Sequence, residues 1–239
     1  MLPSIVDDPA WTVRVDDLRG CSFERFVTYA FDRPVPRTDK EPNWWHGEGV
    51  DEVELLIDGA SQLEHSCAVF RDPLMLHDRF SPDQIEQGFW FLGMGHWSDY
   101  GAFFMDALWD EQLDVGLRCR CVSTMFDLYE KLFSPFPAET ATYMWWDLIA
   151  SFVLEPLGQD EVVPHSVSSH ERVRQEMVQT LGRILTLEPR HCQTAALHGL
   201  NHVATTAERS PLIEEFLRLH HVDEKLRTYA YECLVGQAQ

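Results

Sequence analysis

The amino-acid sequence predicts an all-α fold, in which an irregular helical bundle continues into an α-solenoid of helix pairs. From about residue 50 onward, apolar residues recur at helical spacing, and capping residues and prolines separate the helical segments. In about the last 70 residues, a pair of helical patterns repeats after 34–35 residues, which is typical of stacked helix pairs. Alternating strand patterns are absent after residue 20.

Residues 1–49 are predicted to form an N-terminal helix and a connector. The alternation in Trp11–Val15 fits a short strand or an extended arm. Apolar residues at near-helical spacing predict a helix from Asp16 to about Phe31. Residues 32–49 contain three prolines and two glycines among polar residues, which is the composition of a connecting segment.

Residues 50–167 are predicted to form an acidic helical domain. The clearest helix start is Ser81, because a capping residue is followed there by a proline at the first helical position. Helical runs are expected over residues 51–57, from Ser61 to Pro73, from Ser81 through Leu92, from Ser98 through Leu108, and over residues 111–133 and 138–155.

Residues 168–239 carry the repeat. One apolar stripe of small and apolar residues, from Cys192 to Val203, recurs from Leu226 with a shift of 34 residues. The segments CQTAALHGLNHV and LRTYAYECLVGQ resemble the inner helices of HEAT-like repeat proteins. That resemblance implies an interaction scaffold, and we expect this part to be continuous with residues 50–167.

A second resemblance concerns the middle of the chain. The segment SPDQIEQGFWFL is similar to bacterial proteins of toxin-immunity loci. This resemblance implies an immunity protein that neutralises a cognate toxin.

Charge is distributed very unevenly along the sequence. The formal net charge is −20, and residues 39–167 account for −18 of it with 24 acidic and 6 basic residues. Such a balance argues against direct contact with nucleic acid or an anionic membrane, both of which require a basic surface. Two interpretations remain: a solvated acidic surface that aids solubility, or a docking surface for a basic protein.

The candidate docking residues combine acidic and aromatic side chains. If the helix around residue 106 is continuous, acidic residues spaced four apart share one face of it. Of the two adjacent tryptophans, Trp146 matches the inward stripe, so we expect Trp145 to be partly exposed and to serve as an anchor. The predicted partner-binding residues are Asp99, Asp106, Trp109, Asp110, Glu111, Asp114 and Trp145.

Histidines on the helix that begins near Cys192 are the best metal candidates. His198 and His202 are spaced i, i+4, so they can share an ion, although the pattern HGLNH lacks the glutamate of HExxH. His191 lies one heptad before His198, about 10 Å along the helix axis, which is too far for the same ion. The alternative is that these histidines are hydrogen-bonded where two helices meet.

These observations predict an acidic, all-helical, cytoplasmic protein that binds a basic partner, such as a bacterial toxin, without being an enzyme. We predict no catalytic residues, no cofactor and no membrane contact, and the sequence leaves the oligomeric state open. The alternative function is a helical enzyme with a His/carboxylate site, which could depend on a metal.

Overall fold

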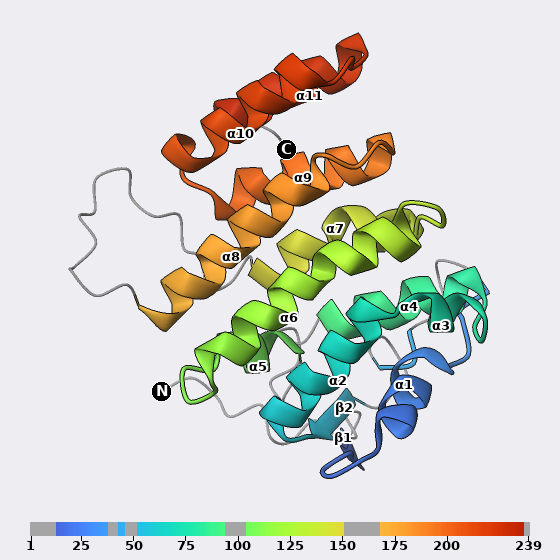
Figure 1. Cartoon of the computed structure of the whole chain (residues 1–239). Coiled ribbons are helices and arrows are strands. Elements are labelled where there is room, and N and C mark those ends of the chain that lie inside the picture. The colour runs from blue at the N-terminus through green and yellow to red at the C-terminus, as the bar shows by residue number, and fades with distance from the viewer. Residues whose placement is uncertain (1–12, 38–42, 46–51, 94–103, 151–167, 237–239) are drawn as a thin grey trace, which may run out of the picture.

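Helices make up most of the protein, as the sequence predicts. The computed structural model describes residues 13–37, 43–45, 52–93, 104–150 and 168–236 (Figure 1). Its helices are α1 (Phe23–Phe31), α2 (Gly59–Arg71), α3 (Leu74–His77), α4 (Pro82–Gly93), α5 (Phe104–Trp109), α6 (Val115–Leu128), α7 (Glu139–Ala150), α8 (Ser169–Ile184), α9 (Arg190–Val203), α10 (Thr206–Leu219) and α11 (Glu224–Leu234).

Two short strands form near the N-terminal end: the first fits the strand alternative for Trp11–Val15, and the second corrects the helical prediction for residues 51–57. β1 (Val13–Asp17) pairs in parallel with β2 (Glu52–Leu56), so residues 51–57 do not continue the helical pattern. Val53 and Leu55 are buried on one side of β2, which is the period-2 alternation of a strand. The first helix also begins later than predicted, at Phe23.

Several helix borders follow the capping residues in the sequence. The predicted start of α4 is confirmed: Ser81 Oγ accepts from the Gln84 backbone N–H at 3.2 Å, and Gln84 Oε1 accepts from the Ser81 N–H at 3.1 Å. The cap of α2 is Asp58, three residues before the expected Ser61. After α6, a π-helical turn over Tyr129–Phe133 continues the predicted long helix.

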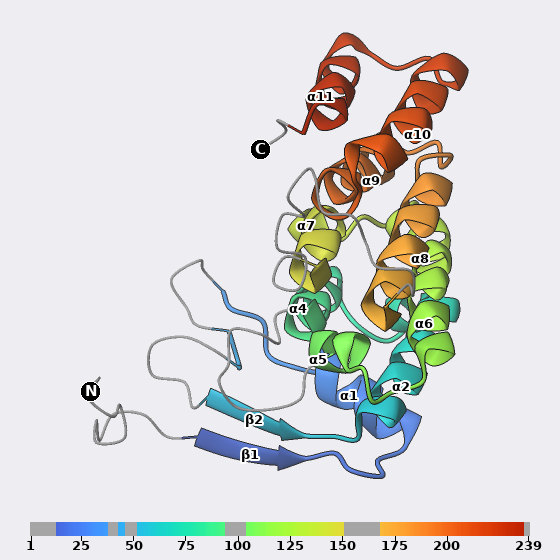
Figure 2. The same ribbon diagram turned by 90° about the vertical axis from the view of Figure 1, so that its left-hand side faces the viewer.

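The helices are stacked in rough chain order along the molecule (Figure 2). The two strands and α1 lie at one end, and α10 and α11 lie at the other. Between them, α6 packs against α2 and α8, while α7 packs against α4 and α9. Within the described residues, no helix combines the length and apolar character that crossing a bilayer requires.

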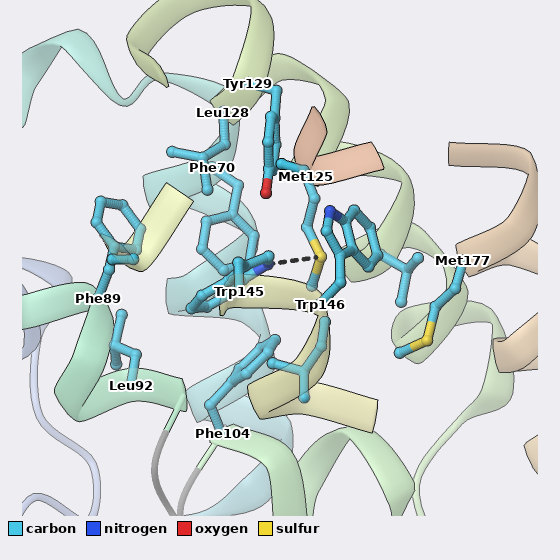
Figure 3. Close-up of a cluster of buried hydrophobic side chains, with 14 of the residues drawn as sticks. Phe70, Phe89, Leu92, Phe104, Met125, Leu128, Tyr129, Trp145, Trp146 and Met177 are labelled. Atoms are coloured by element: carbon cyan, nitrogen blue, oxygen red, sulfur yellow. Dashed lines mark hydrogen bonds between the residues drawn. The ribbon is translucent and has the colours of Figure 1, made fainter. Parts of the chain in front are cut away.

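The centre of the core is formed around two adjacent tryptophans of α7 (Figure 3). Trp145 is 0% exposed, so the expectation of a partly exposed ring is wrong. Its ring lies 5.6 Å from Phe70 and 5.7 Å from Phe89, and its Nε1 lies 3.3 Å from Met125 Sδ. Helix α7 therefore has neighbours on several sides and buries more than one stripe.

Helix α9 approaches its neighbours closely at Gly199. A Cβ atom there would lie 2.7 Å from Leu181 Cδ2 and 2.9 Å from Trp146 Cβ and Cγ. Such distances are too short for carbon atoms, so only glycine fits without a shift of the core. Because the two helices approach closely at Gly199, other side chains of α7 and α9 can also come into contact.

Candidate metal centre

Helices α7 and α9 each contribute a pair of polar residues one helical turn apart. Tyr143 and Asp147 lie on α7, and His198 and His202 lie on α9. Because residues i and i+4 share a helix face, the two pairs face one another where the helices pack. We call this group the α7–α9 cluster.

Three residues of the α7–α9 cluster present possible metal ligands. One ligand atom from each of Asp147, His198 and His202 lies within 4.8 Å of the others. His202 Nδ1 lies 3.7 Å from Asp147 Oδ1, and the two imidazole rings are 4.5 Å apart in an edge-on arrangement. Two imidazoles and one carboxylate form a donor set that suits Zn²⁺ and other first-row divalent metals.

His198 has one satisfied and one unsatisfied ring nitrogen. Its Nδ1 lies 3.0 Å from the hydroxyl of Tyr143 and 3.3 Å from that of Tyr229. Its Nε2 is buried and has no hydrogen-bond partner in the described part of the chain. A buried polar atom without a partner costs about 1–3 kcal/mol, so it requires an explanation.

The environment keeps the His198 ring neutral. Burial, together with the smaller effect of the neighbouring His202, lowers its pKa from 6.5 to about 4, while Asp147 acts in the opposite direction. A neutral imidazole at pH 7 has a free lone pair on one nitrogen. Since Nδ1 is engaged by hydroxyl groups, Nε2 is the nitrogen available to an ion.

The α7–α9 cluster extends from the core to the surface. His198 is only 6% exposed, whereas the side chains of His202 and Asp147 are 36% and 26% exposed. An ion bound here would therefore be anchored on the inside and remain in contact with solvent on the outside. Metal ions in such positions can polarise a bound water molecule.

His191 is separate from the α7–α9 cluster, as its spacing predicts. Its Nε2 lies 2.7 Å from the Phe133 carbonyl oxygen. Together with Thr142, Tyr143, Arg190 and Thr194, it lines a cleft of about 410 Å³ between the same two helices.

Sequence reasoning identified two of the three possible ligands and missed the third. Asp147 lies on a different helix, and no spacing rule connects it to His198. A signal was present, because Asp147 and Tyr143 are polar residues one turn apart in a strongly apolar helix.

The acidic candidate residues lie in α5, at the start of α6 and between these helices. Helix α5 ends at Trp109, and α6 begins at Val115, so Asp106, Asp110 and Asp114 do not share one helix face. The condition of a continuous helix is therefore not met. Asp99 lies outside the described residues.

The acidic residues between α5 and α6 have local structural roles. Asp110 Oδ1 accepts from the Gln112 N–H at 2.8 Å, and Asp114 Oδ1 caps α6 by accepting from the Leu117 N–H at 2.8 Å. Glu111 Oε1 lies 3.3 Å from the Ser169 hydroxyl at the start of α8.

Trp109 belongs to the core. It is 6% exposed, and its Nε1 donates to the Ile149 carbonyl oxygen at 2.7 Å. Neither Trp109 nor Trp145 is therefore accessible to a partner in this conformation.

Comparison with known proteins identifies no relative for this arrangement. No protein-family model matches the chain, and no curated protein or solved structure is significantly similar to it.

Proposed function

We propose that the protein binds a divalent transition-metal ion through Asp147, His198 and His202. The observation that carries this proposal is the buried Nε2 of His198, which has no partner among the described residues and lies in a ring that packs against His202. Coordination would satisfy this nitrogen, and the carboxylate would offset part of the charge of the ion.

The distances between the ligand atoms imply that the side chains move closer together when an ion binds. Zinc bonds of about 2.1 Å place tetrahedral ligand atoms about 3.4 Å apart. The present separations extend to 4.8 Å, so the side chains must move inward by about 1 Å. His202 and Asp147 can do so because both are partly exposed.

Metal analysis after equilibrium dialysis of untagged protein against Zn²⁺ tests the proposal. We expect one equivalent of zinc in the wild-type protein and in His191→Ala, and much less in His198→Ala. The control is matched, since His191 lies on the same helix and has the same residue type. Wild-type protein without zinc, or equal zinc in all three proteins, would contradict the proposal.

A second candidate function rests on charge. We also propose that the acidic segment binds a basic protein, and that a cytoplasmic bacterial immunity protein acting on a toxin is one form of this function. Support comes from the exposed side chains of Asp106, Glu111 and Asp114, within a region that carries −18 of the net charge. Acidic side chains at a rim accelerate capture of a basic partner.

The C-terminal helices fit this second candidate. Helices α8 and α9 form one contacting pair, and α10 and α11 form another. We propose that they are HEAT-like repeats of an α-solenoid, which offers an extended surface to a partner.

Affinity capture from the native host tests this second function. Wild-type protein should retain a basic protein at low salt, and Asp106→Asn/Glu111→Gln should retain less of it. Equal retention by both proteins, or capture of no basic protein, would contradict the second function and leave the metal site unaffected.

A further inference from the structure

Two tyrosine hydroxyls meet at the inner nitrogen of His198. Tyr143 comes from α7 and Tyr229 from α11, and their hydroxyl oxygens are 2.9 Å apart. Both lie within hydrogen-bond distance of His198 Nδ1, and the Tyr143 ring is stacked on the imidazole at 4.2 Å. Helix α11 therefore contributes a residue to the surroundings of the proposed ligand.

The position of one proton decides whether His198 can bind a metal. In one neutral tautomer the proton is on Nε2, which would then be a buried donor without an acceptor in the described structure. In the other, Nδ1 carries the proton and donates it to the Tyr143 oxygen, and the Tyr143 hydroxyl can donate to Tyr229. In this second arrangement no ring N–H is left without an acceptor, and the unpaired group at Nε2 is a lone pair rather than a buried donor.

We infer that Tyr143 and Tyr229 are positioning residues, which hold His198 in the Nδ1–H tautomer and leave the Nε2 lone pair free for the metal. The inference rests on the proposed metal site and names the residues that control it. Histidine ligands commonly donate their second ring N–H to a fixed oxygen, and loss of that partner weakens metal binding about 10- to 100-fold.

The contacts also distinguish this pair from another tyrosine of the helix packing. Tyr143 and Tyr229 are partly buried, whereas Tyr129 is fully buried, and its hydroxyl donates to the Thr142 carbonyl oxygen at 2.6 Å. That bond supports α7 but is not made to His198. Tyr129→Phe is therefore a matched control, since it removes one buried hydroxyl from the same helix packing.

The test combines two measurements on Tyr143→Phe, Tyr229→Phe, the double variant and Tyr129→Phe. The first is ¹⁵N nuclear magnetic resonance of the histidine rings in metal-free protein, which reports the tautomer. The second is Zn²⁺ affinity by competition with a chelator. We expect the wild-type and Tyr129→Phe proteins to show the Nδ1–H tautomer at His198 and equal affinities.

We expect the double variant to show a mixture of tautomers and an affinity about 10- to 100-fold weaker. A wild-type protein with the Nε2–H tautomer, or a double variant unchanged in both measurements, would overturn the inference. The tautomer is measured without metal, so it tests the inference separately. Failure of the wild-type protein to bind Zn²⁺ would overturn the proposed function itself.

Discussion

The α7–α9 cluster and the segment between α5 and α6 are both rich in polar residues, but they satisfy those residues differently. Between α5 and α6, Asp110 and Asp114 accept hydrogen bonds from nearby backbone N–H groups. In the α7–α9 cluster, Nε2 of His198 is buried without a partner in the described residues. The two aspartates of the first region have partners within the chain, whereas one nitrogen of the second region has none among the described residues.

Residue type alone therefore does not indicate a binding site. A capping aspartate such as Asp114 stabilises its helix by about 1 kcal/mol, which is a sufficient structural reason for its presence. A buried nitrogen without a partner costs about 1–3 kcal/mol instead. Several other buried polar atoms of the described residues also lack a partner, but His198 is grouped with a second imidazole and a carboxylate, and this grouping favours a metal ligand.

The largest effect is expected from Gly199→Ala, which would separate the two helices of the cluster. The added Cβ would contact Leu181 and Trp146 at 2.7–2.9 Å, so the core must shift. Overpacking of this kind costs up to about 3 kcal/mol. Urea unfolding should show this loss, and Zn²⁺ binding should weaken as well.

Gly116→Ala is the control for this change. The nearest atoms to a Cβ at Gly116 belong to the side chains of Asp114 and Arg120 in the first turn of α6. We expect a change below about 1 kcal/mol, because alanine favours a helix more than glycine does. A similar loss of stability in both variants would show that the close contact at Gly199 is not its cause.

Asp147→Asn should have the next largest effect. We expect this effect on Zn²⁺ binding and not on the stability of the fold. The substitution keeps the size of the side chain but removes the negative charge that faces His202. We expect Zn²⁺ affinity to fall about 100-fold, with stability little changed. Isothermal titration calorimetry measures the change, and an unaltered affinity would exclude Asp147 as a ligand.

The pH dependence of the metal-free protein should reveal the buried imidazole. The pKa of His198 is about 4 in the folded protein and about 6.5 in the unfolded chain. Above pH 6.5 the ring is neutral in both states, so the free energy of unfolding is highest there with respect to this group. The unfolded chain binds the proton first as the pH falls, and stability decreases until about pH 4. Allowing for partial solvent screening, the loss is about 2 kcal/mol.

Four titratable groups face His198: Tyr143 and Asp147 of α7, His202 of α9 and Tyr229 of α11. Urea unfolding at several pH values, compared between wild type and His198→Phe, measures the contribution of His198. If the free energy of unfolding changes equally with pH in the two proteins, His198 does not titrate as described.

The smallest effects belong to the segment between α5 and α6. Asp114→Ala removes the cap of α6 and should cost about 1 kcal/mol, whereas Asp106→Asn, at an exposed position of α5, keeps the size and a hydrogen-bonding oxygen of the side chain and should change stability by less than about 0.5 kcal/mol. Thermal unfolding separates the two. Equal losses of stability would mean that the capping hydrogen bond is not the reason for the aspartate at position 114.

The sequence predicted the local features of the fold better than the distant ones. Ser81 marks the start of α4 because its cap is made within three residues. The parallel pairing of β1 with β2 joins segments far apart in the chain, so the helical interpretation of residues 51–57 overlooked the alternation of Val53 and Leu55. Trp145 was misjudged because one apolar stripe was assumed for a helix that is covered on several sides.

The same limit applies to the candidate site. His198 and His202 were predicted as a pair because their spacing lies within one helix. Asp147 and Tyr143 reach them only through the packing of α7 on α9, which the glycine at position 199 permits. Contacts that depend on such packing cannot be read from spacing along one helix.

X-ray absorption spectroscopy at the zinc edge, on protein loaded with one equivalent of Zn²⁺, is the sharpest test of the proposed metal centre. We expect two imidazole ligands together with oxygen ligands in the wild-type protein and in His191→Ala. His198→Ala should lose one imidazole from the spectrum of any zinc that it still binds. A wild-type spectrum without imidazole, or an identical spectrum for His198→Ala, would contradict a metal centre between α7 and α9.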